Sequence, residues 1–94
     1  MCTIVLNDLL SNSANLPDAG MKFYDIIKDA LDKSEKVVVN MTNVTALPSI
    51  FLNVSIGKVI EVYGIDRLRH NLSFINITKG QAMRFRDYVT NYKA

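Results

Sequence analysis

The segment of residues 36–64, KVVVNMTNVTALPSIFLNVSIGKVIEVYG, constrains the fold of this chain more than any other segment. Its first residue, Lys36, is followed by three consecutive valines and then by Asn40. A short β-branched run of this kind is typical of a strand buried on both faces of a parallel or mixed sheet. The polar residues of 40–49 indicate a loop, and the long apolar segment 50–63 indicates a helix. We therefore expect a strand, a polar loop and a helix in that order.

The remaining segments continue this alternation. Residues 3–10 predict a short strand with a trailing turn, and residues 72–78 predict a third strand. Apolar residues recur every three or four positions within 18–33 and 80–92, which predicts two more helices, the first with Asp18 as its N-cap. The order β-α-β-α-β-α favours parallel pairing through right-handed crossovers. We predict an α/β fold with a small mixed, mostly parallel sheet and covering helices.

Length and composition predict one domain, residues 1–94, because 94 residues supply a single hydrophobic core. The 49% of hydrophobic and 21% of charged residues are typical of a folded chain. No apolar run reaches the length that spans a bilayer, and the first residues lack the basic leader of a signal peptide. The single cysteine, Cys2, excludes an internal disulfide and fits a reducing compartment. We expect a cytoplasmic domain without a membrane partner.

Residues with catalytic or metal-binding chemistry are few. One histidine, one cysteine and scattered carboxylates give no metal-ligand spacing, and the four glycines lie singly, so no phosphate-binding loop is visible. His70 is the only imidazole base, and its surroundings suggest no nucleophile–histidine–carboxylate set. We therefore predict no metal, no cofactor and no enzymatic activity.

The predicted helix 50–63 has apolar residues around most of its circumference. Such a helix is either enclosed within the domain or part of an exposed contact surface. The sequence leaves both alternatives open for four of its side chains: Phe51, Val54, Val62 and Tyr63.

Hydroxyl side chains, including those of Thr45 and Ser49, lie between the predicted strand and the start of this helix. A helix N-terminus favours negative charge, so a phosphate on Ser49 would be stabilised there. The alternative is that Ser49 only caps the helix. Ser49 is therefore a possible phosphorylation site.

A second functional hypothesis concerns basic residues near the C-terminus. A basic edge would form if two segments lay side by side, and it would contain Arg67, Arg69, His70, Arg84 and Arg86. Such an edge would bind nucleic acid or an anionic ligand. The formal net charge of +2 is too small to indicate nucleic acid, and a solvated charged face is the simpler interpretation. We do not expect a nucleic-acid partner.

The segment VVVNMTNVTALPSIFLN resembles the strand–loop–helix signature of STAS domains, typically VVLDLSGVxxxDSSG. More specifically, the chain is similar to the STAS-like family of uncharacterised prokaryotic domains. The similarity rests on AGMKF at 19–23, IFLNVSIG at 50–57 and LSFINITKGQAMRFRDYV at 72–89. The resemblance implies a STAS-like fold and a regulatory, non-enzymatic role in protein interaction.

The resemblance also implies how a partner would bind. Contacts would come from the loop 40–49 and the start of the helix 50–63, through Thr45, Ser49, Phe51, Asn53 and Val54. The partner would be a protein of the histidine-kinase type of ATPase, or a second copy of the chain through the apolar helix. Antagonist STAS domains carry Asp-Ser-Ser-Gly where this chain has Pro48-Ser49-Ile50-Phe51, and their strand-end Asp is Asn40 here. Their phosphorylatable serine therefore aligns with Ile50.

Overall fold

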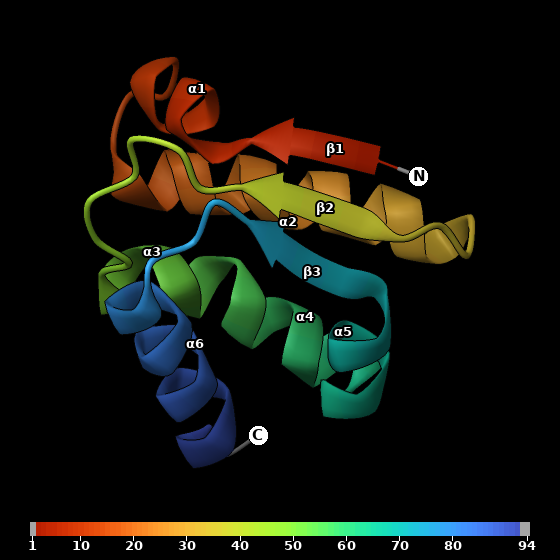
Figure 1. Cartoon of the computed structure of the whole chain (residues 1–94). Helices are drawn as coiled ribbons and strands as arrows, with labels where there is room; N and C mark the ends of the chain where they lie inside the picture. Colours follow the sequence, from red (N-terminus) through yellow and green to blue (C-terminus); the bar gives the residue numbers. More distant parts are fainter. Residues whose placement is uncertain (1, 93–94) are drawn as a thin grey trace.

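The computed structural model describes residues 2–92. Its elements are β1 (Cys2–Val5), α1 (Leu6–Ser11), α2 (Leu16–Asp32), β2 (Val37–Asn40), α3 (Ser49–Val54), α4 (Ile56–Tyr63), α5 (Ile65–Asn71), β3 (Leu72–Ile75) and α6 (Lys79–Asn91). Within these residues the strands form one sheet of order β1-β2-β3, and both strand pairs are parallel (Figure 1). The α/β class, the alternating order and the mostly parallel sheet predicted from the sequence are confirmed.

The helices gather on one face of the sheet. Because the strand order follows the chain, crossovers of a single hand place the connecting helices on the same side. In Figure 1, α2 runs behind β2. The inward side chains of Val37 and Val39 are fully buried, whereas Val38 between them is half-buried and Val5 and Ile75 are 41% and 45% exposed. The prediction that the central strand is buried on both faces is therefore wrong.

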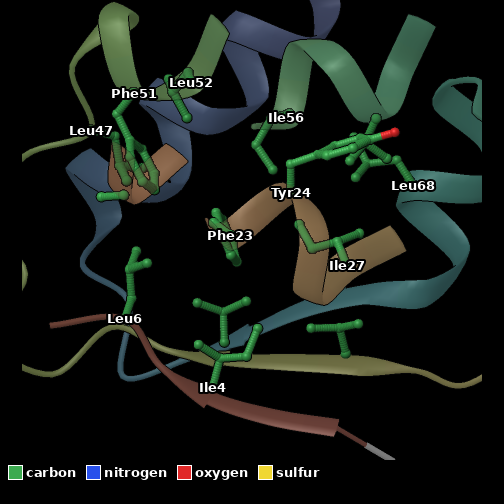
Figure 2. Packing of buried hydrophobic residues seen from close by; sticks show 14 of the residues in the cluster. Ile4, Leu6, Phe23, Tyr24, Ile27, Leu47, Phe51, Leu52, Ile56 and Leu68 are labelled. Carbon is green, nitrogen blue, oxygen red and sulfur yellow. The ribbon is translucent and has the colours of Figure 1, made fainter. Parts of the chain in front are cut away.

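The core lies between the sheet and the helices, as Figure 2 shows. Ile4 and Leu6 approach it from the β1 side, and Phe23 and Ile27 approach it from α2. The rings of Phe23 and Phe51 stack with their centroids 5.6 Å apart and an interplanar angle of 11°. This aromatic pair joins α2 to α3, and aromatic pairs contribute beyond their buried area.

The predicted single helix 50–63 is two helices, α3 and α4, which meet at Ser55. The backbone of Ser55 has φ −119° and ψ −84°, outside the helical region. Its buried hydroxyl donates a hydrogen bond of 2.8 Å to the carbonyl oxygen of Phe51. A serine hydroxyl bonded to the carbonyl four residues earlier competes with the backbone and bends helices. The helix is therefore interrupted at this residue.

Residues 6–11, predicted as the end of a strand and a turn, form the helix α1. Leu6, Leu9 and Leu10 have the spacing of one helical face, and Leu6 is fully buried. The short apolar run of β1 obscures this spacing, because strand and helix signals overlap there.

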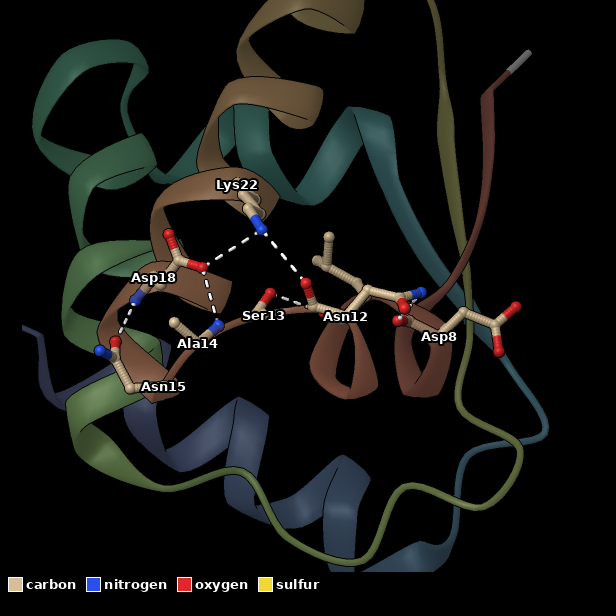
Figure 3. Close-up of polar contacts among 8 residues, drawn as sticks. Asp8, Asn12, Ser13, Ala14, Asn15, Asp18 and Lys22 are labelled. Atoms are coloured by element: carbon tan, nitrogen blue, oxygen red, sulfur yellow. Dashed lines mark hydrogen bonds and ion pairs between the residues drawn. The ribbon is translucent and has the colours of Figure 1, made fainter.

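The N-cap of α2 is Asn15 and not Asp18 as predicted. The side-chain oxygen of Asn15 accepts a hydrogen bond of 2.8 Å from the backbone N–H of Asp18 (Figure 3). The carboxylate of Asp18 accepts from the N–H of Ala14 at 3.0 Å and pairs with Lys22 at 3.2 Å. These two contacts lower the pKa of Asp18. Asp18 thus stabilises the first turn from the third helical position.

Gly20 allows α2 and α3 to approach closely. A Cβ atom at Gly20 would lie 2.3 Å from Cγ2 of Val54 and 2.8 Å from the carbonyl oxygen of Phe51. Both distances are shorter than van der Waals contact.

We expect Gly20→Ala to destabilise the domain. Although alanine favours a helix over glycine by about 1 kcal/mol, the clash forces the helices apart at a cost of about 1–3 kcal/mol. Urea unfolding measures the difference. The matched control is Gly80→Ala, where a Cβ meets nothing within 4 Å, and its stability should be equal to or above that of the wild type. A Gly20→Ala variant as stable as Gly80→Ala would contradict the close packing of α2 and α3.

Candidate functional site

The loop 41–48, at the carboxyl end of β2, is anchored by every third side chain. Met41, Val44 and Leu47 are buried, with exposed fractions of 1%, 7% and 6%. The side-chain amide of Gln81, in α6, donates a hydrogen bond to the carbonyl oxygen of Val44. Between the anchors lie four exposed residues: Thr42, Asn43, Thr45 and Ala46. The loop is therefore held from the core side and open to solvent on the other.

Asn40 fixes the start of this loop. Its Oδ1 atom accepts three hydrogen bonds: from the N–H of Thr42 at 3.0 Å, from the hydroxyl of Thr42 at 2.6 Å and from Nδ2 of Asn76 at 3.1 Å. Asn76 follows β3 and has a positive φ of 56°. The N–H of Met41 also donates to the carbonyl oxygen of Ile75 at 2.9 Å. These bonds connect the loop to the β3–α6 connection across the carboxyl edge of the sheet.

Residues 45–48 form a ridge between two clefts. One cleft, of about 340 Å³, lies towards α1 and the start of α2 and is lined on that side by Leu10 and Leu16. The other, of about 430 Å³, lies towards α6 and is lined there by Thr78, Gln81 and Arg84. Among residues 2–92, no charged side chain lines the first cleft, and Arg84 is the one charged side chain that lines the second. Figure 3 shows the α1–α2 connection that borders the first cleft. The ridge is thus accessible from both sides.

The start of α6 contributes the side chain of Gln81, which the sequence analysis did not identify. Thr78 and Gln81 form a capping box, and the guanidinium of Arg84 donates a hydrogen bond of 2.8 Å to the hydroxyl oxygen of Ser49. The spacing of Thr78 and Gln81 is a recognised capping signal that could have been read from the sequence. Ser49 itself is the first residue of α3, whose N-cap is Pro48, and makes no capping bond.

The predicted contact residues are divided between surface and core. Thr45, Ser49 and Asn53 are exposed, and Oδ1 of Asn53 accepts a hydrogen bond of 2.7 Å from the hydroxyl of Tyr88. Val54 is half-buried and faces Gly20.

The structure corrects the interpretation of Phe51. Its side chain is only 1% exposed and stacks on Phe23, so in this structure it stabilises the core and presents no surface to a partner.

The basic residues lie in two separate groups. The guanidinium of Arg67 donates to the carbonyl oxygen of Leu31 at 2.6 Å and lies 5.4 Å from the ring centroid of Tyr63. Arg84 instead bonds Ser49. In Figure 1, α5 and α6 lie on opposite sides of α4. The remaining three side chains are exposed: Arg69, His70 and Arg86. The structure therefore does not bring the five into one edge.

The second half of α6 rests on α4 through two tyrosines. A Cβ at Gly57 would lie 2.7 Å from the hydroxyl oxygen of Tyr88 and 2.9 Å from Cε1 of Tyr92. The hydroxyl of Tyr92 donates to Glu61, and this hydrogen bond, with some burial, raises the pKa of Tyr92 to about 12. Burial also raises the pKa of Tyr88. These contacts hold α6 beside the ridge.

Within residues 2–92, no three histidine, cysteine or carboxylate side chains lie close enough to hold a metal ion. Among the helices of the same residues, none combines the length and the apolar character needed to cross a membrane.

The described residues form an α/β domain with a polar loop between the strand β2 and the helix α3. A family model described as "STAS-like domain of unknown function (DUF4325)" matches residues 19–82. The match begins within α2 and ends within α6, and it includes β2, the loop 41–48 and β3. The chain therefore belongs to this family, which confirms the resemblance. Neither the curated proteins nor the solved structures compared with the chain gave a match.

The contribution of the three hydrogen bonds accepted by Asn40 can be measured with two variants. Asn40→Leu removes the acceptor of three solvent-exposed hydrogen bonds, whose donors water can then reach, so we expect a loss of about 0.5–1.5 kcal/mol in unfolding free energy. Asn40→Asp is the matched control, because a carboxylate can accept all three bonds. Urea unfolding compares the two variants. Equal losses in both would contradict the role of Oδ1.

Proposed function

We propose that this chain is a non-enzymatic regulatory module that binds a protein partner through the loop 40–49 and the start of α3. One observation carries the proposal: Thr45 and Ala46 of the ridge 45–48 are exposed between two clefts, while the buried side chains of Val44 and Leu47 anchor them. An anchored loop loses little conformational entropy when it binds, so its contacts are not offset by a large ordering cost. Membership of the STAS-like family supports the proposal.

The chemistry of the ridge favours a mostly uncharged partner surface. The first cleft is lined by apolar side chains and by side chains with an amide or a hydroxyl group. The lining of the second cleft also contains one positive charge, the guanidinium of Arg84. A partner would fill the clefts with apolar side chains and place an acceptor near Arg84. A histidine-kinase-type ATPase is the partner class that the STAS resemblance suggests, and self-association is the alternative.

Ser49 offers a means of regulation within this proposal. Its hydroxyl is exposed and already contacts Arg84. A phosphate on Ser49 would form charge-assisted hydrogen bonds with that guanidinium and would reverse the local charge beside the ridge. Phosphorylation would therefore change which partners the ridge accepts.

The contact set that we propose to test is Thr45, Ala46, Ser49 and Asn53. It leaves out Phe51, which is buried, and Val54, which is half-buried against Gly20. A photo-crosslinking amino acid is placed at Thr45 in the host cell, and a control is placed at Asp66, an exposed position on α5. We expect Thr45 to cross-link one protein that Asp66 does not. The partner is then purified and its affinity measured by calorimetry.

We expect Ala46→Arg to weaken this affinity at least about tenfold, because a bulky charge would stand on the ridge. The matched control is Met21→Arg on α2, also exposed, which should leave the affinity unchanged. Identical cross-links from both positions, or equal affinities of the two variants, would refute the proposed binding surface.

A further inference from the structure

A ladder of three hydrogen bonds between side chains holds residues 84–92 against α3 and α4. The donors come from the end of α6 and the acceptors from α3 and α4: Arg84 to Ser49 at 2.8 Å, Tyr88 to Asn53 at 2.7 Å and Tyr92 to Glu61. The donors lie four residues apart and therefore share one helical face. Gly57 lies in α4 between the last two acceptors, and its missing side chain leaves room for both tyrosines.

The hold on residues 84–92 is weak. All three hydrogen bonds are exposed to solvent, and water can replace either partner of an exposed bond. Both ion pairs found among residues 2–92 lie within α2, so neither fastens α6. α6 buries two residues, Gln81 and Val89, whereas α2 buries seven. Elements with few buried side chains and exposed hydrogen bonds open locally while the rest of a protein stays folded.

The amino end of α6 is held more firmly. Gln81 is buried, caps the helix and donates a hydrogen bond to the carbonyl oxygen of Val44. The ring of Phe85 packs edge-on against that of Phe74 in β3, with 4.8 Å between the centroids. In Figure 1, α6 extends away from the sheet towards its carboxyl end. Loosening from that end would therefore leave the first turn of α6 attached.

Two of the three acceptors in the ladder belong to the proposed partner-contact set. The side-chain oxygens of Ser49 and Asn53 both accept hydrogen bonds from α6. A partner that bonds to these oxygens has to compete with Arg84 and Tyr88. Glu61, the third acceptor, lies outside the contact set, so the last bond of the ladder can be changed without altering a contact residue.

We propose that residues 84–92 act as an autoinhibitory strap, which occupies part of the partner-binding surface until the partner displaces it. This inference rests on the proposed function and names a means of its regulation. The apparent affinity for the partner equals the intrinsic affinity multiplied by the fraction of molecules in which the strap is open. A change that weakens the seat of the strap on α4 therefore raises the apparent affinity.

Gly57→Ala tests the strap without altering a contact residue. The added Cβ would lie 2.7 Å from the hydroxyl oxygen of Tyr88 and 2.9 Å from Cε1 of Tyr92, so both rings must leave their seat, while alanine favours the helix α4 itself. The matched control is Gly80→Ala, where a Cβ meets nothing within 4 Å. Hydrogen exchange of the purified chain should accelerate at least about tenfold at residues 86–91 in Gly57→Ala alone, with the amides of α2 unchanged.

The photo-crosslinking amino acid at Thr45 then serves as the binding probe in the host cell, under conditions in which wild-type cross-linking is far from complete. Gly57→Ala should give at least about threefold more adduct than Gly80→Ala, because more molecules are open. Tyr92→Phe removes the bond to Glu61 and should raise the yield in the same direction. It replaces Gly57→Ala if circular dichroism shows that the alanine alters the fold.

Two results would overturn the strap and leave the proposed function standing. The first is unchanged hydrogen exchange at residues 86–91 in both Gly57→Ala and Tyr92→Phe. The second is accelerated exchange in Gly57→Ala together with an adduct yield equal to or below that of Gly80→Ala. No adduct from any of the chains, the wild type included, would refute the proposed function and this inference with it.

Discussion

The order of the strands in the sheet determines the rest of this structure. The three parallel strands follow one another in sequence order, so crossovers of one hand carry their helices to a single side. The hydrophobic core is consequently one-sided, between α2, α3 and α4 and the inward faces of the strands. The parallel direction also brings the carboxyl ends of all three strands to one edge, where the loop 41–48 and the start of α6 meet.

At that edge, polar side chains position the exposed residues. Asn40 joins the loop to the β3–α6 connection, and Gln81 both caps α6 and bonds the loop carbonyl of Val44. Buried anchors at every third position leave Thr45 and Ala46 on the surface. This combination of a fixed backbone with exposed, mostly uncharged side chains suits recognition of a protein surface and is the physical basis of the proposed function.

The sequence predicted the class, the strand β2 and most of α2, because each has a strong local pattern. It could not predict that the helix 50–63 breaks at Ser55, since the cause is one buried hydroxyl within an otherwise apolar run. It left Phe51 open between core and surface, because apolar residues around a whole helix do not reveal which side is covered. The contacts of Arg84 with Ser49 and of Gln81 with Val44 join residues far apart in sequence, which no local spacing encodes.

The placement of all covering helices on one side is tested most directly by methyl NMR with a soluble paramagnetic probe. Such a probe broadens the signals of solvent-facing methyl groups and leaves buried ones sharp. The structure predicts strong broadening of the methyl signals of Val5 and Ile75, which face solvent. It predicts little broadening for Ile4 and Val39, which point to the opposite, buried face of the sheet. Equal protection of the two sets would contradict the one-sided fold, because it would mean that both faces of the sheet are covered.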